Sequence, residues 1–369
     1  MDVFSMKKIH DIILSRNPAK GEKFIAKLKG KKPLFVCTIG TTDTAKIPGL
    51  SIAGENPDLT DYTPPADMEL LLLGKCKCIP GVPITPDGIP TPGLTTKAAL
   101  ELGIIPSIVV SGGVNVKPQI PFIELGGSQG RDIRTGKALD NVGEVIDRGI
   151  LAGESLARVA DYIVIGESVP AGTTTALGVL LAMGIPAENK VSSSMPSNPH
   201  HLKINTVREG MAAAGIGVGA YANDPLKAVS CFGDPMMPAA VGLIIGAASR
   251  GPVIMAGGTQ MGAVLALVNG LNSDAIDNLA IGTTRWIIED KTSDLSGIVD
   301  SIADVPILAA DLDYSKSKYP GLRTYEMGVA KEGVGCGGAS IAAMIKTEGA
   351  VTKDAILRKV ESIYAQLRG

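Results

Sequence analysis

The chain of 369 residues has few aromatic side chains, because Phe, Trp and Tyr together make up 4 % and there is one tryptophan. The core must therefore be built mostly from Ile, Leu, Val, Ala and Met. An excess of charge is lacking too, since the formal net charge is −2. This balance argues against a nucleic-acid-binding protein, which normally carries a clustered excess of Lys and Arg.

Long hydrophobic segments and metal-binding patterns are also missing. The longest uncharged stretch, residues 251–273, is interrupted by Gly, Thr, Gln and Asn, so we expect no membrane span. The N-terminal residues lack the features of a secretion signal. Five scattered cysteines make no disulfide scaffold, and neither a second pair nor a nearby histidine accompanies Cys76 and Cys78 to complete a metal site. We expect a cytoplasmic protein with no metal ion and no cofactor.

Glycine, by contrast, is abundant, with 45 residues, and two glycine-rich segments each carry a glutamate. Residues 332–338 read Glu-Gly-Val-Gly-Cys-Gly-Gly, and residues 166–175 read Gly-Glu-Ser-Val-Pro-Ala-Gly-Thr-Thr-Thr. Glycines leave backbone N–H groups open to a ligand. We interpret the two segments as one site for a phosphorylated, cationic sugar compound, in which Glu332 and Glu167 handle protons and charge.

Short apolar runs alternate with helical patterns along most of the chain. The runs predict strands at 32–38, 68–73, 107–110, 162–165, 253–255 and 306–309, and the periodic stretches predict helices at 141–159, 173–183, 234–248 and 262–269. This order predicts βαβ units and a mostly parallel, doubly wound (Rossmann-like) α/β sheet. We predict one α/β domain over 32–345 and a small helical subdomain formed by residues 1–31 and 346–369.

Ligands of such sheets bind at the carboxyl ends of the strands. Gly257, Gly258 and residues 282–284 follow apolar runs, so they should meet Glu167 at one rim. Residues 172–175 begin a helix whose free N–H groups could bind an anion, and Lys203, at the head of another helix, is a second candidate for phosphate. Simpler interpretations stay open: plain helix capping at 172–175, and a solvated loop carboxylate at Glu332 beside Lys331.

Other motifs are weaker. Residues 333–338 match G-x-G-x-x-G, but only 31 residues follow and they have no βαβ pattern, so dinucleotide binding is disfavoured. A phosphate-binding P-loop is excluded because Gly136-Lys137 is followed by alanine. Asp311 and Asp313 are interpreted as a surface turn rather than a Mg²⁺ pair, and His200 and His201 as surface residues.

These residues resemble the nicotinate-nucleotide:dimethylbenzimidazole phosphoribosyltransferases of cobamide assembly. The family's G-E-M-G-I-G-N-T-T is similar to residues 166–174, and its E-G-x-G-A to residues 332–335. Three shorter similarities keep the family's order, at residues 130–139, 202–207 and 255–259. The chain departs from the family at two places. Residues 53–58 read A-G-E-N-P-D and lack the histidine of the family's A-G-D-H-G-V, and residues 282–286 replace a histidine-rich stretch of the family.

The resemblance implies transfer of 5-phosphoribosyl from nicotinate mononucleotide to a benzimidazole-type base, giving an α-riboside phosphate for the lower ligand of cobamides. No pyrophosphate departs, so Mg²⁺ is not obligatory. The resemblance implies Glu332 as general base and Glu167 as the partner of the ribose or of the charge at C1. Expected phosphate or ribose partners, or close backbone neighbours, are Lys203, Gly172, Thr173, Thr174, Gly257, Gly258, Thr284, Gly333 and Gly335.

Other functions remain open. A non-catalytic nucleotide sensor on the same fold, a transferase that uses a different heterocyclic acceptor, and an oxidoreductase that uses the glycine loop would each fit part of the sequence. The family resemblance also implies a homodimer, and it implies neither a nucleic-acid nor a membrane partner.

Overall fold

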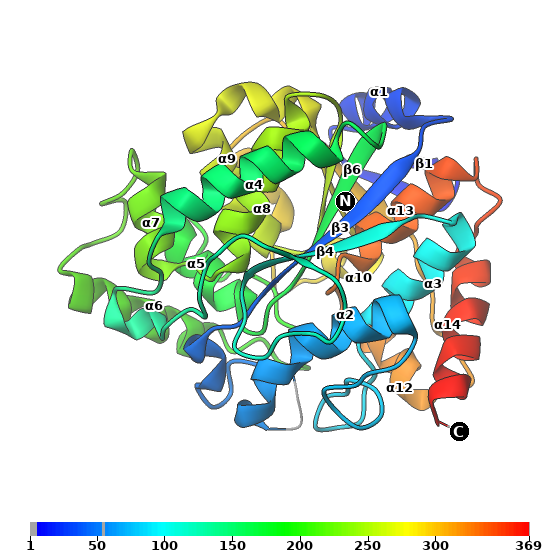
Figure 1. The fold of residues 1–369 in the computed structure, drawn as a ribbon, viewed down its shortest axis with the longest axis horizontal. Coiled ribbons are helices and arrows are strands. Elements are labelled where there is room, and N and C mark those ends of the chain that lie inside the picture. The colour runs from blue at the N-terminus through cyan, green and yellow to red at the C-terminus, as the bar shows by residue number, and fades with distance from the viewer. Residues whose placement is uncertain (1–5, 54–55, 369) are drawn as a thin grey trace.

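A nine-stranded sheet runs through the molecule in the order β1-β2-β9-β8-β7-β6-β3-β4-β5 (Figure 1). The computed structural model describes residues 6–53 and 56–368. Strands from β9 to β5 pair in parallel, whereas β2 pairs antiparallel with β9 and β1 antiparallel with β2. The predicted mostly parallel, doubly wound α/β sheet is confirmed. The strands are β1 (Lys8–Ile9), β2 (Ile12–Arg16), β3 (Pro33–Gly40), β4 (Ser107–Gly113), β5 (Ile123–Glu124), β6 (Tyr162–Ser168), β7 (Val253–Ala256), β8 (Leu279–Thr284) and β9 (Ile307–Ala310).

Helices cover both faces of this sheet (Figure 1). Side chains alternate between the faces along β3, so Leu34 and Val36 join one hydrophobic cluster while Phe35 and Cys37 join the other. One face carries α4 (Val142–Leu156), α5 (Gly172–Ala182), α6 (His200–Ala214), α7 (Pro225–Phe232), α8 (Met236–Ala248), α9 (Gln260–Leu271) and α11 (Leu295–Asp300). The other carries α1 (Pro18–Leu28), α2 (Thr63–Leu73), α3 (Gly93–Gly103), α12 (Pro320–Arg323), α13 (Cys336–Lys346) and α14 (Lys353–Arg368). The short α10 (Arg285–Ile288) contributes to both clusters.

Two sequence expectations on secondary structure are wrong. Residues 12–16 are not helical: they form β2, and Ile12 and Ile13 are completely buried against β9. Residues 68–73 are not a strand but the end of α2. This helix has two prolines in its first turn and is buried along most of its length. In both places the apolar residues are continuous, and such a run does not show whether the segment is a buried strand or a buried helix.

The terminal segments pack on the same framework. Phe24 of α1 and Ile356 of α14 belong to the hydrophobic cluster that also contains Phe35 of β3. Residues 1–5 and 369, which were part of the expected helical subdomain, lie outside the described residues. None of the helices in the described parts is both long and apolar enough to cross a membrane.

Helices α4 and α8 cross at very short range, and glycines make that approach possible. A Cβ on Gly246 would lie 2.1 Å from the Ile150 carbonyl oxygen, and one on Gly242 would lie 2.4 Å from the Ile146 carbonyl oxygen. These obstacles are backbone atoms, which cannot move aside as a flexible side chain can. The pair of helices therefore fixes the layer that supports β3, β4 and β6.

We predict that Gly246→Ala lowers the free energy of unfolding by about 1–3 kcal/mol, the usual range for overpacking a tight core. Gly143→Ala, in α4, is the matched control, because a Cβ there meets nothing within 4 Å. Its stability should be unchanged or raised, since alanine favours helix over glycine. Urea denaturation followed by circular dichroism measures both; equal stability of the two variants would contradict the packing argument.

Candidate functional site

Two glycines bring the acidic turns into contact. Gly166 lies in β6, next to Glu167, and Gly335 precedes α13 with a φ of +63°. A Cβ on Gly335 would lie 2.8 Å from the Gly166 Cα, and a Cβ on Gly166 would lie 3.1 Å from the Gly335 Cα. The two backbones thus touch at a separation that side chains would prevent. As a result Glu167 and Glu332, far apart in sequence, line the same cavity.

This cavity opens at the carboxyl ends of β6 and the neighbouring strands. Its volume, including the part open to solvent, is about 1010 Å³. Its walls come from residues 50–53, 83–92, 167–173, 192–194 and 330–334, with single contributions from other loops. Of the residues that the sequence placed at one rim, Glu167 and Gly258 line this cavity, whereas Gly257 and residues 282–284 do not. Three loops that the sequence did not place there also line it: 50–53, 83–92 and 192–194.

Glu332 is held by the start of α13. Its carboxylate accepts hydrogen bonds from the N–H groups of Gly333 (3.2 Å) and Gly337 (3.3 Å), and the Cys336 thiol lies 3.3 Å from it. Burial raises the pKa of Glu332 to about 7, and these hydrogen bonds oppose the rise. At neutral pH the group can therefore both accept and release a proton. The alternative of a solvated loop carboxylate does not fit this half-buried position, in which backbone N–H groups hold the carboxylate.

Glu167 also lines the cavity, and it is buried. The side-chain amide of Gln260 donates a 2.8 Å hydrogen bond to its Oε1 atom. Burial raises the pKa of Glu167 well above its ordinary value, and the negative charge of Glu332 raises it further. The two carboxyl groups are therefore coupled, because ionisation of one makes ionisation of the other less favourable.

A third carboxyl group in the cavity, Asp67 of α2, was missed from the sequence. It accepts hydrogen bonds from the hydroxyls of Thr91 (2.7 Å) and Ser168 (2.9 Å), and burial raises its pKa to about 6. The interpretation of residues 68–73 as a strand hid this acid. A carboxylate placed directly before a buried apolar run was the available signal.

The expected phosphate and ribose partners divide into two groups. Those that line the cavity are Gly172, Thr173, Gly258 and Gly333. The other five lie behind its wall: Thr174, Gly257, Gly335, Thr284 and Lys203. Gly257 nonetheless stays close, since a Cβ there would lie 3.7 Å from the Glu167 Oε1 atom.

Lys203 and Thr284 support cavity loops from behind. The fully buried Lys203 ammonium donates to the Ser192 carbonyl (2.6 Å) and to the Asn198 side chain (3.1 Å). Burial lowers the pKa of Lys203 to about 7. Thr284 donates through its hydroxyl to the Lys331 carbonyl at 2.6 Å.

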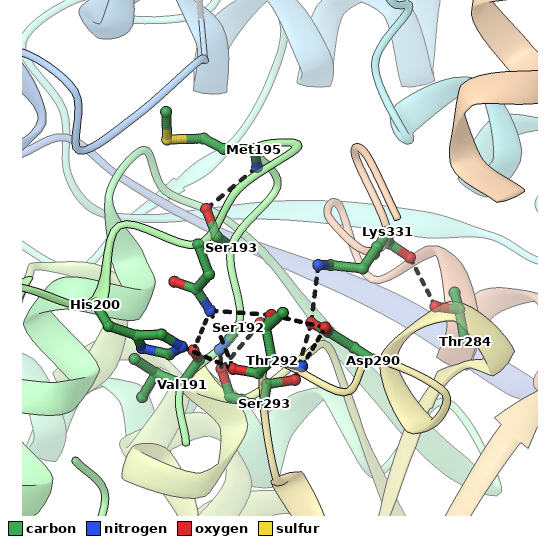
Figure 2. A network of polar contacts seen from close by, with 12 residues as sticks. Val191, Ser192, Ser193, Met195, His200, Thr284, Asp290, Thr292, Ser293 and Lys331 are labelled. Carbon is green, nitrogen blue, oxygen red and sulfur yellow. Dashed lines mark hydrogen bonds and ion pairs between the residues drawn. The ribbon is translucent and has the colours of Figure 1, made fainter. Parts of the chain in front are cut away.

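A polar network joins these loops (Figure 2). His200 contacts the Thr292 carbonyl at 2.9 Å, and the Thr292 hydroxyl donates to Asp290 at 2.7 Å. Asp290 in turn forms a 2.8 Å ion pair with Lys331, and both side chains are buried. The sequence suggested a surface position for His200 and gave no role to Asp290. Lys331 was seen only as a neighbour of Glu332.

Asp311 also differs from its expected position. It is 6 % exposed and forms ion pairs with Lys8 (2.8 Å), Lys353 (3.4 Å) and Arg285 (3.7 Å). It therefore ties the N-terminal strands to the sheet rather than lying in a surface turn. Within residues 6–53 and 56–368, no group of three or more His, Cys, Asp or Glu is placed to hold a metal ion.

Comparisons with known proteins agree with this fold. A family model described as a phosphoribosyltransferase matches residues 108–285. A nicotinate-nucleotide-dimethylbenzimidazole phosphoribosyltransferase from Thermus thermophilus superimposes with a TM-score of 0.56 at 15 % identity, covering 90 % of this chain and 92 % of the other. At this identity the superposition shows a shared fold.

Curated relatives give the family. A UPF0284 protein of Sulfurisphaera tokodaii is 44 % identical over 92 % of this chain and 95 % of its own length. A UPF0284 protein of Methanothermobacter thermautotrophicus is 45 % identical over 85 % and 88 %. The chain therefore belongs to the UPF0284 family, and its residues 108–285 match the phosphoribosyltransferase family model.

We predict that Glu332→Gln stabilises the protein at alkaline pH. The pKa of Glu332 rises on folding from its ordinary value of 4.5 to about 7, so ionising the group in the folded protein opposes folding increasingly above pH 4.5 and fully above pH 7. Glutamine removes this cost, and the gain should reach up to roughly 3 kcal/mol at pH 8. It should decline as the pH falls through 7 and disappear below about 4.5, as thermal unfolding between pH 4 and 8 would measure.

The control is Glu144→Gln, because Glu144 is exposed and pairs with Arg148 on the surface of α4. Its effect should stay within about 0.5 kcal/mol at every pH. A Glu332→Gln effect that does not change with pH would contradict the burial of an ionisable group at this position.

Proposed function

We propose that this protein transfers the 5-phosphoribosyl group from nicotinate mononucleotide to a benzimidazole-type base. The products are nicotinate and an α-riboside phosphate, which serves as the lower ligand of cobamides. The observation that carries the proposal is the meeting of Glu167 and Glu332 in one cavity at the carboxyl ends of the strands. Membership of a phosphoribosyltransferase family supports the type of reaction.

The reaction needs one proton acceptor, and Glu332 fits that role. A ring nitrogen of the acceptor attacks C1 of the ribose with its lone pair. The bond from C1 to the nicotinate nitrogen breaks, and its electron pair neutralises the positive pyridinium ring. The acceptor's other ring nitrogen then loses its proton to the Glu332 carboxylate, whose pKa of about 7 suits proton transfer near neutrality.

Glu167 suits binding of the ribose. Burial raises the pKa of Glu167 well above its ordinary value, and its carboxyl oxygens can accept a hydrogen bond from a ribose hydroxyl. Gln260, which donates to Oε1, fixes the orientation of that group. The positive charge that develops at C1 favours the ionised form, so Glu167 can also stabilise the reacting state.

The start of α5 would contribute backbone donors to the phosphate. Gly172 and Thr173 line the cavity there, and the first N–H groups of a helix attract anions. Gly258 and Gly333 allow close approach to the sugar. Lys203, Thr174 and Thr284, which lie behind the wall, would act by holding loops in place.

The acceptor base would contact apolar side chains of the cavity lining. Ile52, Pro83, Ile89, Pro90 and Val334 are among the lining residues and offer apolar contacts to an aromatic ring. Residues 54–55 lie outside the described residues. They belong to residues 53–58, where the chain departs from the family's A-G-D-H-G-V. A heterocycle other than benzimidazole would use the same wall. We also propose a homodimer that works in the cytoplasm.

We predict that Glu332→Gln lowers kcat for nicotinate release by about 10²-fold or more, the usual contribution of a general base. Binding of nicotinate mononucleotide should change little, because the donor does not need the base. The measurement is nicotinate formation by chromatography at saturating benzimidazole, together with donor affinity from calorimetry.

Glu188→Gln is the control, because Glu188 is a surface partner of Arg208 outside the cavity, and it should keep the parent rate. Activity of Glu332→Gln within a few-fold of the parent would remove Glu332 from the base role. Donor binding without nicotinate release from the unmodified protein would favour the sensor. Release with other heterocycles alone would favour a different acceptor.

A further inference from the structure

Lys331 has an unusual position for a lysine. It lies directly before Glu332, it is 5 % exposed, and it lines the cavity. Among the described residues of the lining, it carries the one cationic side chain, whereas Asp67, Glu167 and Glu332 carry carboxyl groups. A cavity that takes a phosphorylated ligand needs a positive charge to offset these acids.

The Lys331 ammonium has spare hydrogen-bonding capacity. It lies 2.8 Å from the Asp290 carboxylate, and within residues 6–53 and 56–368 no second acceptor is bonded to it. An ammonium group has three N–H donors. Asp290 is well satisfied without it, since its carboxylate also accepts from Thr292 and Ser293. A buried lysine with unused donors beside a cavity is prepared for an anionic ligand.

The facing loop offers more donors. Ser194 lies next to the lysine, because the Ala330 N–H donates to the Ser194 carbonyl at 3.0 Å. The N–H of Ser192 donates to Thr259 at 2.9 Å. The N–H groups of Ser193 and Ser194, in contrast, have no hydrogen-bond partner in the described parts of the chain. Both residues line the cavity, so their N–H groups are available to an anionic ligand that binds there.

We infer that Lys331 and the Ser193–Ser194 backbone bind the phosphate group of a phosphosugar, with Asp290 as the counter-ion that holds the lysine while the site is empty. The inference rests on the proposed function and extends it. It moves the charged phosphate contact from Lys203, which is committed to Ser192 and Asn198, to Lys331.

Asp290 and the phosphate then compete for the same ammonium group. Removal of the lysine should weaken phosphate binding, whereas removal of the negative charge at Asp290 should leave binding unchanged or strengthen it. If the ion pair served only to hold the loops together, either substitution would weaken binding in the same direction. The two single variants therefore separate a ligand-binding role from a structural one.

The test is calorimetric titration of ribose 5-phosphate, inorganic phosphate and ribose into the full chain. Ribose 5-phosphate should bind the parent more tightly than ribose does. Lys331→Met should lose about 10- to 100-fold in affinity for ribose 5-phosphate, as expected for lost hydrogen bonds to a charged group. Asp290→Asn should match or exceed the parent. Lys190→Met, a surface control paired with Asp294, should bind as the parent does.

Thermal unfolding of each variant checks the fold, and Lys331→Met/Asp290→Asn, which leaves no buried unpaired charge, replaces Lys331→Met if that variant does not fold. Parent-like binding of ribose 5-phosphate by the lysine variant, or absence of binding by the parent, overturns the inference. So does a matching loss in Asp290→Asn. Nicotinate release, assayed in parallel, decides the proposed function separately: an inactive parent that binds through Lys331 leaves the phosphate site standing.

Discussion

The contact between Gly166 and Gly335 is the constraint on which the site depends. Gly166 lies within β6, in the middle of the sheet, and Gly335 directly precedes α13, which covers it, with a positive φ that favours glycine. Because no side chain intervenes, the residues beside them face one cavity. Any side chain at either position would push β6 and α13 apart and separate Glu167 from Glu332.

The arrangement has an energetic consequence. Burial raises the pKa values of Glu332, Glu167 and Asp67, so the ionised forms are costly to keep in the folded protein. Such a cluster is expected at a functional site rather than in a core that serves stability alone. The surrounding framework, with its close α4–α8 crossing and its completely buried strands, supplies the stability that the cavity lacks.

The sequence revealed the sheet and the two acidic turns because both leave local signals. Apolar runs at regular intervals marked β3, β4, β6, β7 and β9, and Glu167 and Glu332 stood out as acids among glycines. The signals failed where burial hides periodicity: β2 resembled a helix and α2 a strand, which concealed Asp67. Lys331 and Asp290 could not be paired from sequence, because their ion pair depends on how two distant loops pack. Lys203 was the cation suggested by the resemblance, and in the structure its ammonium group supports a loop from behind.

The central claim is that Glu167 and Glu332 act on one bound nucleotide and its acceptor. The most direct test is a crystal structure of the protein with nicotinate mononucleotide and benzimidazole. The account predicts the ribose against Glu167 and a benzimidazole nitrogen within hydrogen-bonding distance of the Glu332 carboxylate. Ligands bound elsewhere, or a benzimidazole whose nitrogens face away from Glu332, would contradict it.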